Sequence, residues 1–130
     1  MTPRPRTVQP SSTVVEAAQV MKSEDVGIVP IVEGDRLAGV VTDRDVTIEV
    51  VAERKDPEST TVGEIASSNL VTVDPDQNLD EALRLMAQHQ VRRLPVCEED
   101  GRLVGILAQA DVAEHAKAKQ KGEVIERISQ

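Results

Sequence analysis

A hydroxyl and a carboxylate lie three residues apart, at Thr42 and Asp45, where the apolar segment Gly39–Val41 gives way to polar residues. In one interpretation the pair is a capping box, in which Thr42 begins a helix and Asp45 returns a hydrogen bond. In the other, Asp45 accepts the two hydroxyls of a ribose, while Thr42 and the free N–H groups of the helix start hold a phosphate. The residue types favour the capping box and leave nucleotide binding open.

The surrounding pattern occurs twice in the chain. At a spacing of 65 residues, Thr7-Val8 returns as Thr72-Val73 and Pro30 as Pro95, and at 66 residues Asp45 returns as Asp111. Matched apolar, turn and acidic positions predict two copies of one supersecondary unit, each too small to bury its own apolar face. We therefore expect function to lie between the copies.

The residue pattern of each copy predicts secondary-structure elements in the order strand, helix, strand, strand, helix. The apolar stripes of the first helices have helical spacing and follow N-cap residues, Thr13 and Asn78. The stripes are Val14, Ala17, Ala18 and Met21 in one copy, and Leu79, Ala82, Leu83 and Met86 in the other. Hairpin strands are expected at 26–32 and 37–42, and again at 91–97 and 103–108, with helices starting near 43 and 109. Pro30 and Pro95 suit edge positions because proline lacks an N–H donor.

Composition and the repeat together suggest the division of the chain. We expect a first repeat at 1–52, a charged linker at 53–61, a second repeat at 62–121 and a tail at 122–130, all in one compact module. Val62–Ile65 is predicted as a short helical turn that leads into the second repeat. The tail is predicted as a helix interrupted at Gly122.

Composition also restricts the function. The chain of 130 residues has no Phe, Tyr or Trp and a net charge of -8, which argues against stacking on single-stranded nucleic acid and against duplex DNA. No apolar run approaches the roughly 18 residues of a membrane span, so a cytoplasmic protein is expected. The chain lacks a phosphate-binding glycine loop, an identifiable nucleophile with its base, and Cys/His spacing for zinc. We expect no catalytic residue, no metal site and an inert thiol at Cys97.

The duplicated order and spacing, with Pro30 in Ile-Val-Pro-Ile-Val, Pro95 in Arg-Leu-Pro-Val-Cys and the stretch from Gly39 to Asp45, resemble a tandem pair of cystathionine-β-synthase (CBS) domains, a Bateman module. The resemblance implies a fold of the α+β or α/β class, with two βαββα repeats packed about a pseudo-two-fold axis. Such pairs often dimerise, and their two clefts bind adenosyl compounds such as AMP, ADP, ATP or S-adenosylmethionine. No required cofactor is implied.

Transferred residue by residue, the resemblance implies two unequal clefts. In the first, Thr42 and Asp45 hold ribose and phosphate, with Arg44 a further phosphate contact, a surface residue paired with Asp43 or a solvated side chain. The second repeat contributes to this cleft the residues Leu70, Val71, Thr72, Val91, Arg92 and Arg93. The second cleft pairs Asp111 with Arg6, Thr7 and Val26, but Ala108 replaces the hydroxyl, and Gly27 and Ile28 replace the two arginines. We expect this cleft to be weak or empty.

The resemblance therefore implies a regulatory module that binds an adenine nucleotide, has no catalytic activity and acts on an unidentified protein target. The alternative is a ligand-free structural or interaction module that acts through dimerisation. A homodimer is expected because the second helices carry more apolar residues than one intramolecular contact needs. These residues are Val46, Val50, Val51, Ala113 and Ala116.

Overall fold

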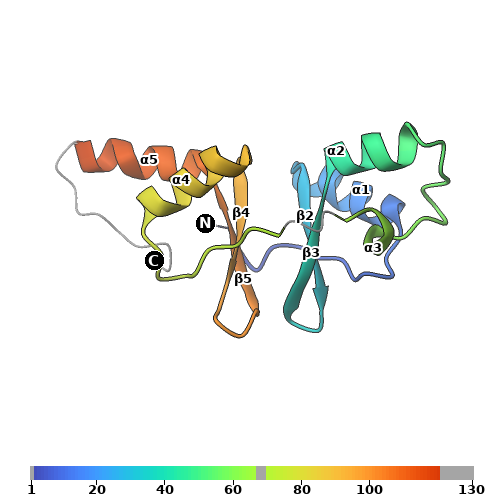
Figure 1. Cartoon of the computed structure of the whole chain (residues 1–130), viewed down its shortest axis with the longest axis horizontal. Helices are drawn as coiled ribbons and strands as arrows, with labels where there is room; N and C mark the ends of the chain where they lie inside the picture. Colours follow the sequence, from blue (N-terminus) through green and yellow to red (C-terminus); the bar gives the residue numbers. More distant parts are fainter. Residues whose placement is uncertain (1, 67–69, 121–130) are drawn as a thin grey trace. The chain divides into compact units, whose positions relative to one another are not determined.

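A computed structural model describes residues 2–66 and 70–120, with side chains from 115 onward left aside. The chain forms two packing units, residues 6–70 and residues 1–5 with 71–130 (Figure 1). Each has its own core of Val, Ala, Ile, Leu or Met side chains, as a chain without aromatic residues requires. Within the described residues, no helix has the length and apolar character to cross a membrane.

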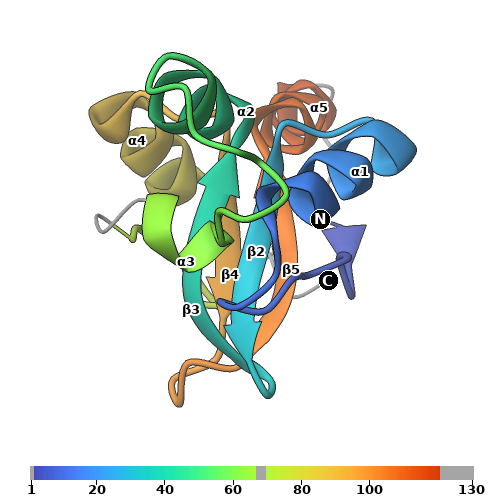
Figure 2. The same ribbon diagram turned by 90° about the vertical axis from the view of Figure 1, so that its right-hand side faces the viewer.

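The unit of residues 6–70 is a β-hairpin covered by two helices. Strands β2 (Ile28–Glu33) and β3 (Arg36–Thr42) pair antiparallel, and helices α1 (Val14–Glu24) and α2 (Asp43–Val46) pack on them. Helix α2 continues into a π-helical turn, η1 (Thr47–Val51). The hairpin turn contains Gly34 at a φ of 67°, a conformation that glycine adopts without strain. Figure 2 shows α1 and α2 together at one side of the hairpin.

The other unit repeats this arrangement. Strands β4 (Arg93–Cys97) and β5 (Leu103–Ala108) pair antiparallel, with helices α4 (Leu79–His89) and α5 (Gln109–Gln120) beside them. The short strand β1 (Thr2–Pro3) pairs with β5, so the N-terminus belongs to the sheet of the second repeat. Both hairpins have a register shift at the same repeat position, between Ile31 and Val32 and between Val96 and Cys97.

The first strand of each predicted repeat is reduced to a single parallel bridge. Val8 pairs with Ile31, and Val73 pairs with Val96. The carbonyl of Pro30 accepts the Val8 N–H at 3.0 Å, and that of Pro95 accepts the Val73 N–H at 3.0 Å. Because N–H and C=O of a strand residue point the same way, each missing proline donor faces a side with only this one bridge. The prolines therefore interrupt no ladder, as the edge prediction required.

The helix caps follow the predicted pattern. The Thr13 hydroxyl accepts the Glu16 N–H at 3.2 Å, and the side-chain oxygen Oδ1 of Asn78 accepts the Asp80 N–H at 2.7 Å. Helices α1 and α4 end at equivalent left-handed residues, Asp25 and Gln90, with φ of 54° and 55°. The two repeats therefore also share the backbone conformation that ends their first helices.

Two positions of the predicted stripes are wrong. Ala18 and Leu83 are exposed, whereas Val20 of α1 is buried. The two short helices each use a narrower apolar face than the sequence pattern suggests, because one hairpin covers only part of a helix circumference.

The segment between the repeats packs back onto the first one. The Thr60 carbonyl accepts the Val14 N–H at 2.9 Å, and its hydroxyl donates to the Asp56 carbonyl at 2.8 Å. Helix α3 (Val62–Ile65) places Val62 and Ile65 in the core of the unit 6–70, although it was expected to lead into the second repeat. The predicted tail, 122–130, lies outside the described residues.

Candidate functional site

Thr42 and Asp45 form a reciprocal capping box at the junction of β3 and α2. The Thr42 N–H donates to Asp45 Oδ2 at 2.8 Å, and the Asp45 N–H donates to Thr42 Oγ1 at 3.1 Å. Both residues are partly exposed. The capping interpretation of these residues is confirmed.

The box leaves part of each side chain available. Asp45 uses Oδ2 in the box, and no described residue hydrogen-bonds to Oδ1. The Thr42 hydroxyl acts as an acceptor, so its own proton remains a donor. A carboxylate oxygen and a hydroxyl donor, held by the same short helix start, fit a polyol and an anion respectively. Capping and ligand binding are therefore compatible in this pair.

The start of α2 is also tied to the preceding hairpin. The Asp43 N–H donates to the Gly27 carbonyl at 2.9 Å, and the Arg44 N–H donates to Asp43 Oδ1 at 2.9 Å. A Cβ at Gly27 would lie 2.9 Å from Asp43 Oδ2, so the missing side chain provides room for this carboxylate. Among the described ion pairs none includes Arg44, whose exposed guanidinium is not engaged by Asp43 as one interpretation expected.

The equivalent site in the second repeat has half of the box. The Ala108 N–H donates to Asp111 Oδ2 at 3.1 Å, but Ala108 has no hydroxyl to complete the pair. The Gln109 N–H donates to the Arg92 carbonyl at 2.7 Å, which repeats the contact of Asp43 with Gly27. Arg92 therefore carries a side chain at the position equivalent to Gly27. In the first repeat this position has no side chain, and the Asp43 carboxylate lies beside it.

Three of the remaining residues predicted for the first site lie at the start of the second hairpin, and three precede α4. Val91 and Arg92 are exposed, and Arg93 begins β4 opposite Ala108. No ion pair or side-chain hydrogen bond of a described residue engages either guanidinium. Leu70 and Thr72 are exposed, and Val71 is partly buried.

Among the residues of the predicted second site, Arg6 is already engaged. Its Nη1 donates to Ser23 Oγ at 2.9 Å, and its Nε lies 3.7 Å from Glu24 Oε1. Thr7 is exposed, and Val26 and Asp111 are partly buried. These two contacts hold Arg6 against the end of α1.

The other candidate groups have structural roles. Cys97 is buried, and burial raises the pKa of its thiol. Within the described residues, no group of three or more His, Cys, Asp or Glu side chains is placed to hold a metal ion.

Sequence reasoning did not identify the second capping box, in which Glu64 Oε2 accepts the Thr61 N–H at 2.7 Å. The three-residue spacing of a threonine and a glutamate was the available signal.

Comparison with known proteins identifies the family. A sequence model of the CBS domain matches residues 1–52 and 62–118. The CBS domain-containing protein YhcV of Bacillus subtilis is 41% identical over 130 residues, 99% of this chain and 91% of that protein. The chain belongs to the CBS domain family and is a pair of CBS domains.

Two solved structures support the same assignment. The crystal structure of Hypoxic Response Protein I with two coordinated zinc ions has a TM-score of 0.82 and 42% identity, covering 88% of this chain and 93% of that chain. The crystal structure of CBSX2 in complex with AMP has a TM-score of 0.79 and 29% identity, covering 92% of this chain and 94% of that one. The predicted CBS-pair fold is thus confirmed.

Proposed function

We propose that this CBS pair is a regulatory module that binds an adenosyl nucleotide and has no catalytic activity of its own. The observation that carries the proposal is the Thr42–Asp45 box, which leaves one carboxylate oxygen and one hydroxyl donor at a partly exposed helix start. The AMP complex of CBSX2, a protein of the same fold, supports an adenine nucleotide as the ligand.

In this proposal Asp45 and Thr42 recognise different parts of the ligand. Asp45 Oδ1 accepts hydrogen bonds from the ribose hydroxyls, because a carboxylate oxygen has two lone pairs. The Thr42 hydroxyl donates to a phosphate oxygen, and the exposed Arg44 adds a positive charge. The box keeps both groups in place before the ligand arrives, so little side-chain freedom is lost on binding.

Residues of the second repeat complete the proposed ligand contacts. The guanidinium groups of Arg92 and Arg93 have no partner among the described residues and are proposed to bind phosphate. Leu70, Val71, Thr72 and Val91 are proposed to surround the adenine. An aliphatic surround is the available choice in a chain without aromatic residues.

The second set of residues is proposed to bind weakly. Ala108 offers no hydroxyl, and Arg6 already uses Nη1 and Nε in contacts with Ser23 and Glu24. Of the Thr42–Asp45 pair, the second repeat keeps only the carboxylate, as Asp111. We therefore propose one nucleotide per chain.

Calorimetric titration tests the proposal with AMP, ADP, ATP and S-adenosylmethionine, and with GMP as the control for the base. Binding of at least one adenosyl compound, with GMP weaker, is the expected result. A ligand at about one hundred times its dissociation constant should add roughly 2.7 kcal/mol to the free energy of unfolding. Absence of heat and of any thermal shift with all four compounds would overturn the proposal and favour the ligand-free interaction module.

We further propose that the module forms a homodimer through its helices. Val51 is 68% exposed, which supports an apolar surface for a second copy. Val50, in contrast, is 1% exposed and belongs to the core, so it was wrongly assigned to this surface. Ala113 is exposed, and the side chain of Ala116 lies outside the description.

A further inference from the structure

The two repeats carry different charges at the start of their hairpins. The Asp43 N–H donates to the Gly27 carbonyl at 2.9 Å, and the Gln109 N–H donates to the Arg92 carbonyl at 2.7 Å. These two contacts are equivalent by the repeat, because Gly27 returns as Arg92 and Asp43 as Gln109. The first repeat thus has an aspartate beside a glycine where the second has a glutamine beside an arginine.

The Asp43 carboxylate lies directly beside Gly27. Its Oδ1 accepts the Arg44 N–H at 2.9 Å, and a Cβ at residue 27 would lie 2.9 Å from Oδ2. The carboxylate therefore takes up the space into which a side chain at residue 27 would project. Oδ2 accepts no hydrogen bond from a described residue, and no described Lys or Arg forms an ion pair with Asp43. Asp43 presents an exposed negative charge with an acceptor to spare.

This charge lies next to residues of the second proposed site, which consists of Arg6, Thr7, Val26 and Asp111. Gly27 directly follows Val26 in the chain. In the first proposed site Arg92 and Arg93 are assigned to phosphate, and their equivalents at the second site are Gly27 and Ile28. The remaining cation, Arg6, has its Nε 3.7 Å from Glu24 Oε1, so its charge is already offset. The second site therefore offers a carboxylate where the first offers guanidinium groups.

We propose that Asp43, placed by Gly27, determines the charge selectivity of the second site. The site excludes a 5′-phosphate and takes a nucleoside with a positively charged 5′ substituent. This inference rests on the proposed adenosyl-binding function and specifies the ligand class of its weaker site. Asp43 Oδ2 accepts a charge-assisted hydrogen bond from the cationic group. A phosphate at the same place meets a like charge that no described cation neutralises.

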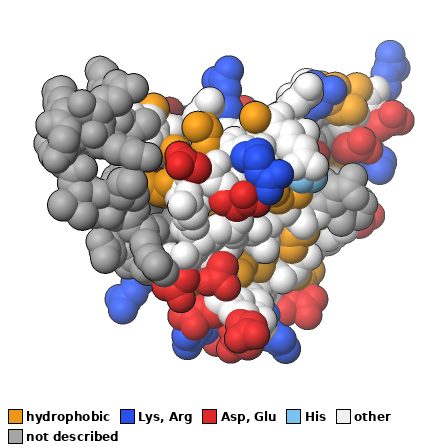
Figure 3. Space-filling view, turned by 60° about the vertical axis from the view of Figure 1, so that its left-hand side comes forward, with side chains coloured by type: hydrophobic (Ala, Val, Ile, Leu, Met, Phe, Trp, Pro, Cys, Tyr) orange, Lys and Arg blue, Asp and Glu red, His pale blue; other side chains and the backbone are white. Residues whose placement is uncertain are grey.

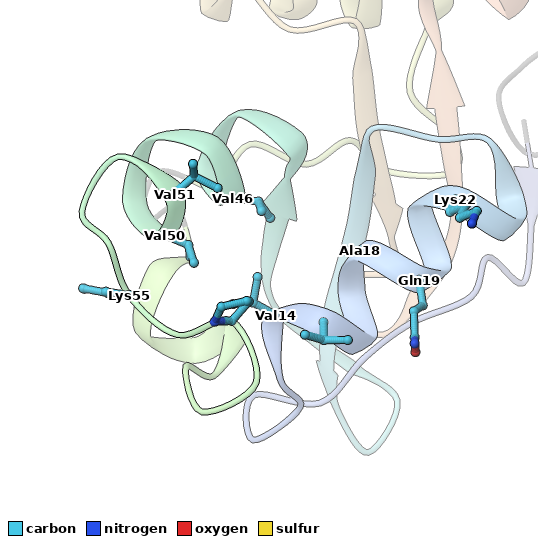
Figure 4. A pocket seen from close by; sticks show the side chains of 10 residues that line it. Val14, Ala18, Gln19, Lys22, Val46, Val50, Val51 and Lys55 are labelled. Atoms are coloured by element: carbon cyan, nitrogen blue, oxygen red, sulfur yellow. The ribbon is translucent and has the colours of Figure 1, made fainter.

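The apolar groove of the same unit is a separate feature. It has a volume of about 360 Å³ and lies between α1 and the helix formed by α2 and η1 (Figure 4). Its lining includes Val46 and Val50 but neither Gly27 nor Asp43. A substitution of Asp43 therefore removes no residue that lines the groove.

The first test uses two probes that differ only at the 5′ position. 5′-Amino-5′-deoxyadenosine has a primary amine that is protonated at pH 7, whereas adenosine has a neutral hydroxyl. In calorimetric titration Asp43→Asn should weaken binding of the amine by at least about tenfold, because the charge is lost. Adenosine affinity should not change. The amide retains an acceptor for the Arg44 N–H, and unchanged thermal melting verifies folding. Unchanged amine affinity in Asp43→Asn would overturn the inference.

The acidic character of the chain requires a charge control. The net charge is -8, and Figure 3 shows acidic side chains on much of the face seen there, so the chain attracts any cation in general. Asp35→Asn removes the same charge from an exposed position in the turn at the opposite end of the hairpin. It should leave amine affinity unchanged. Equal losses in Asp35→Asn and Asp43→Asn would overturn the inference.

The second test transfers the pair to the other repeat. The double variant Arg92→Gly, Gln109→Asp gives the second repeat the residues of the first, at two exposed positions. Its matched control is Arg92→Gly, Gln109→Asn, which has the same size without the charge. Both should bind AMP at least about tenfold more weakly than the unaltered chain, because Arg92 is lost. Only the Asp variant should gain amine affinity. Equal amine affinity in the two double variants would overturn the role assigned to the carboxylate.

This inference and the proposed function can fail separately. Loss of amine binding in Asp111→Asn, with binding retained in Asp45→Asn, is expected if the amine occupies the second site. A chain that binds AMP but shows no amine binding sensitive to Asp43 would overturn this inference and leave the proposed function intact. A chain that binds neither AMP nor the amine would overturn both.

Discussion

Asp45 and Thr42 each satisfy a backbone N–H of the other, at 2.8 and 3.1 Å, whereas Asp111 and Ala108 share one such bond, at 3.1 Å. The two repeats therefore differ at the position that is proposed to hold the nucleotide. A single missing hydroxyl accounts for the difference, and it predicts measurable changes in stability and in binding.

The Thr42–Asp45 box should contribute to stability without any ligand. Asp45→Ala should lower the free energy of unfolding by about 1 kcal/mol, the usual cost of a lost cap. Asp45→Asn should cost less, since an acceptor oxygen remains. Urea unfolding followed by circular dichroism checks both variants.

Glu64→Ala is the matched control, because it removes a capping box at α3 that has no proposed ligand contact. It should cost a similar free energy of unfolding and leave nucleotide affinity unchanged. Equal loss of nucleotide affinity in Glu64→Ala and Asp45→Ala would mean that the box acts on the ligand only through folding.

Completing the second box should stabilise the protein. In Ala108→Thr the new hydroxyl can accept the Asp111 N–H, as Thr42 accepts that of Asp45, and the expected gain is about 1 kcal/mol. Ala110→Thr, an exposed change in the first turn of α5, should give no gain because threonine is a poorer helix former than alanine. Equal effects of the two substitutions in urea unfolding would contradict the capping explanation.

Arg92 and Arg93 should distinguish phosphate from adenosine. The double variant Arg92→Ala, Arg93→Ala should weaken ATP binding by at least about tenfold, because each charge-assisted hydrogen bond is worth about 1.5 to 3 kcal/mol. Adenosine binding should change little. The double variant Arg84→Ala, Arg102→Ala, which removes two arginines paired with Glu81 and Glu98, controls for net charge. A parallel loss for ATP and adenosine in calorimetry would refute the phosphate role.

Cys97 should react slowly with alkylating reagents. Its burial raises the pKa of the thiol, so less thiolate forms at a given pH than in the unfolded chain. The raised pKa stabilises the fold below the unfolded-state value, and this contribution is lost as pH rises through the folded-state value. Iodoacetamide labelling followed by mass spectrometry should be at least about tenfold slower in buffer than in denaturant. Gln88→Cys in a Cys97→Ser background supplies the exposed control, and similar rates for the two thiols would contradict the buried assignment.

The repeat allowed much of the fold to be predicted from sequence. The second hairpin strand at 103–108, the caps at Thr13 and Asn78, and the paired prolines all follow from local pattern and spacing. Tertiary packing determined which core each element joins, and the local pattern could not predict this. Helix α3 has the composition of a lead-in to the second repeat, yet Val62 and Ile65 fill the first core.

At the candidate site the local contacts could be predicted from sequence, whereas the tertiary contacts could not. The Thr42–Asp45 spacing indicated the box, since both bonds are local. The contacts of Arg6 with Ser23 and Glu24 depend on where the chain meets the end of α1, which no local pattern specifies. The room that Gly27 gives the Asp43 carboxylate is likewise a tertiary feature.

The most direct measurement of the central claim is a calorimetric titration of AMP into two variants side by side, Asp45→Asn and Asp111→Asn. The unaltered chain should bind one AMP per chain. Asp45→Asn should lose at least about tenfold in affinity, because its one oxygen is used in the box and an NH2 donor replaces the oxygen that accepts the ribose hydroxyls. Asp111→Asn should bind as the unaltered chain does. Equal losses in both variants, or a loss confined to Asp111→Asn, would show that the nucleotide is not held by the Thr42–Asp45 pair.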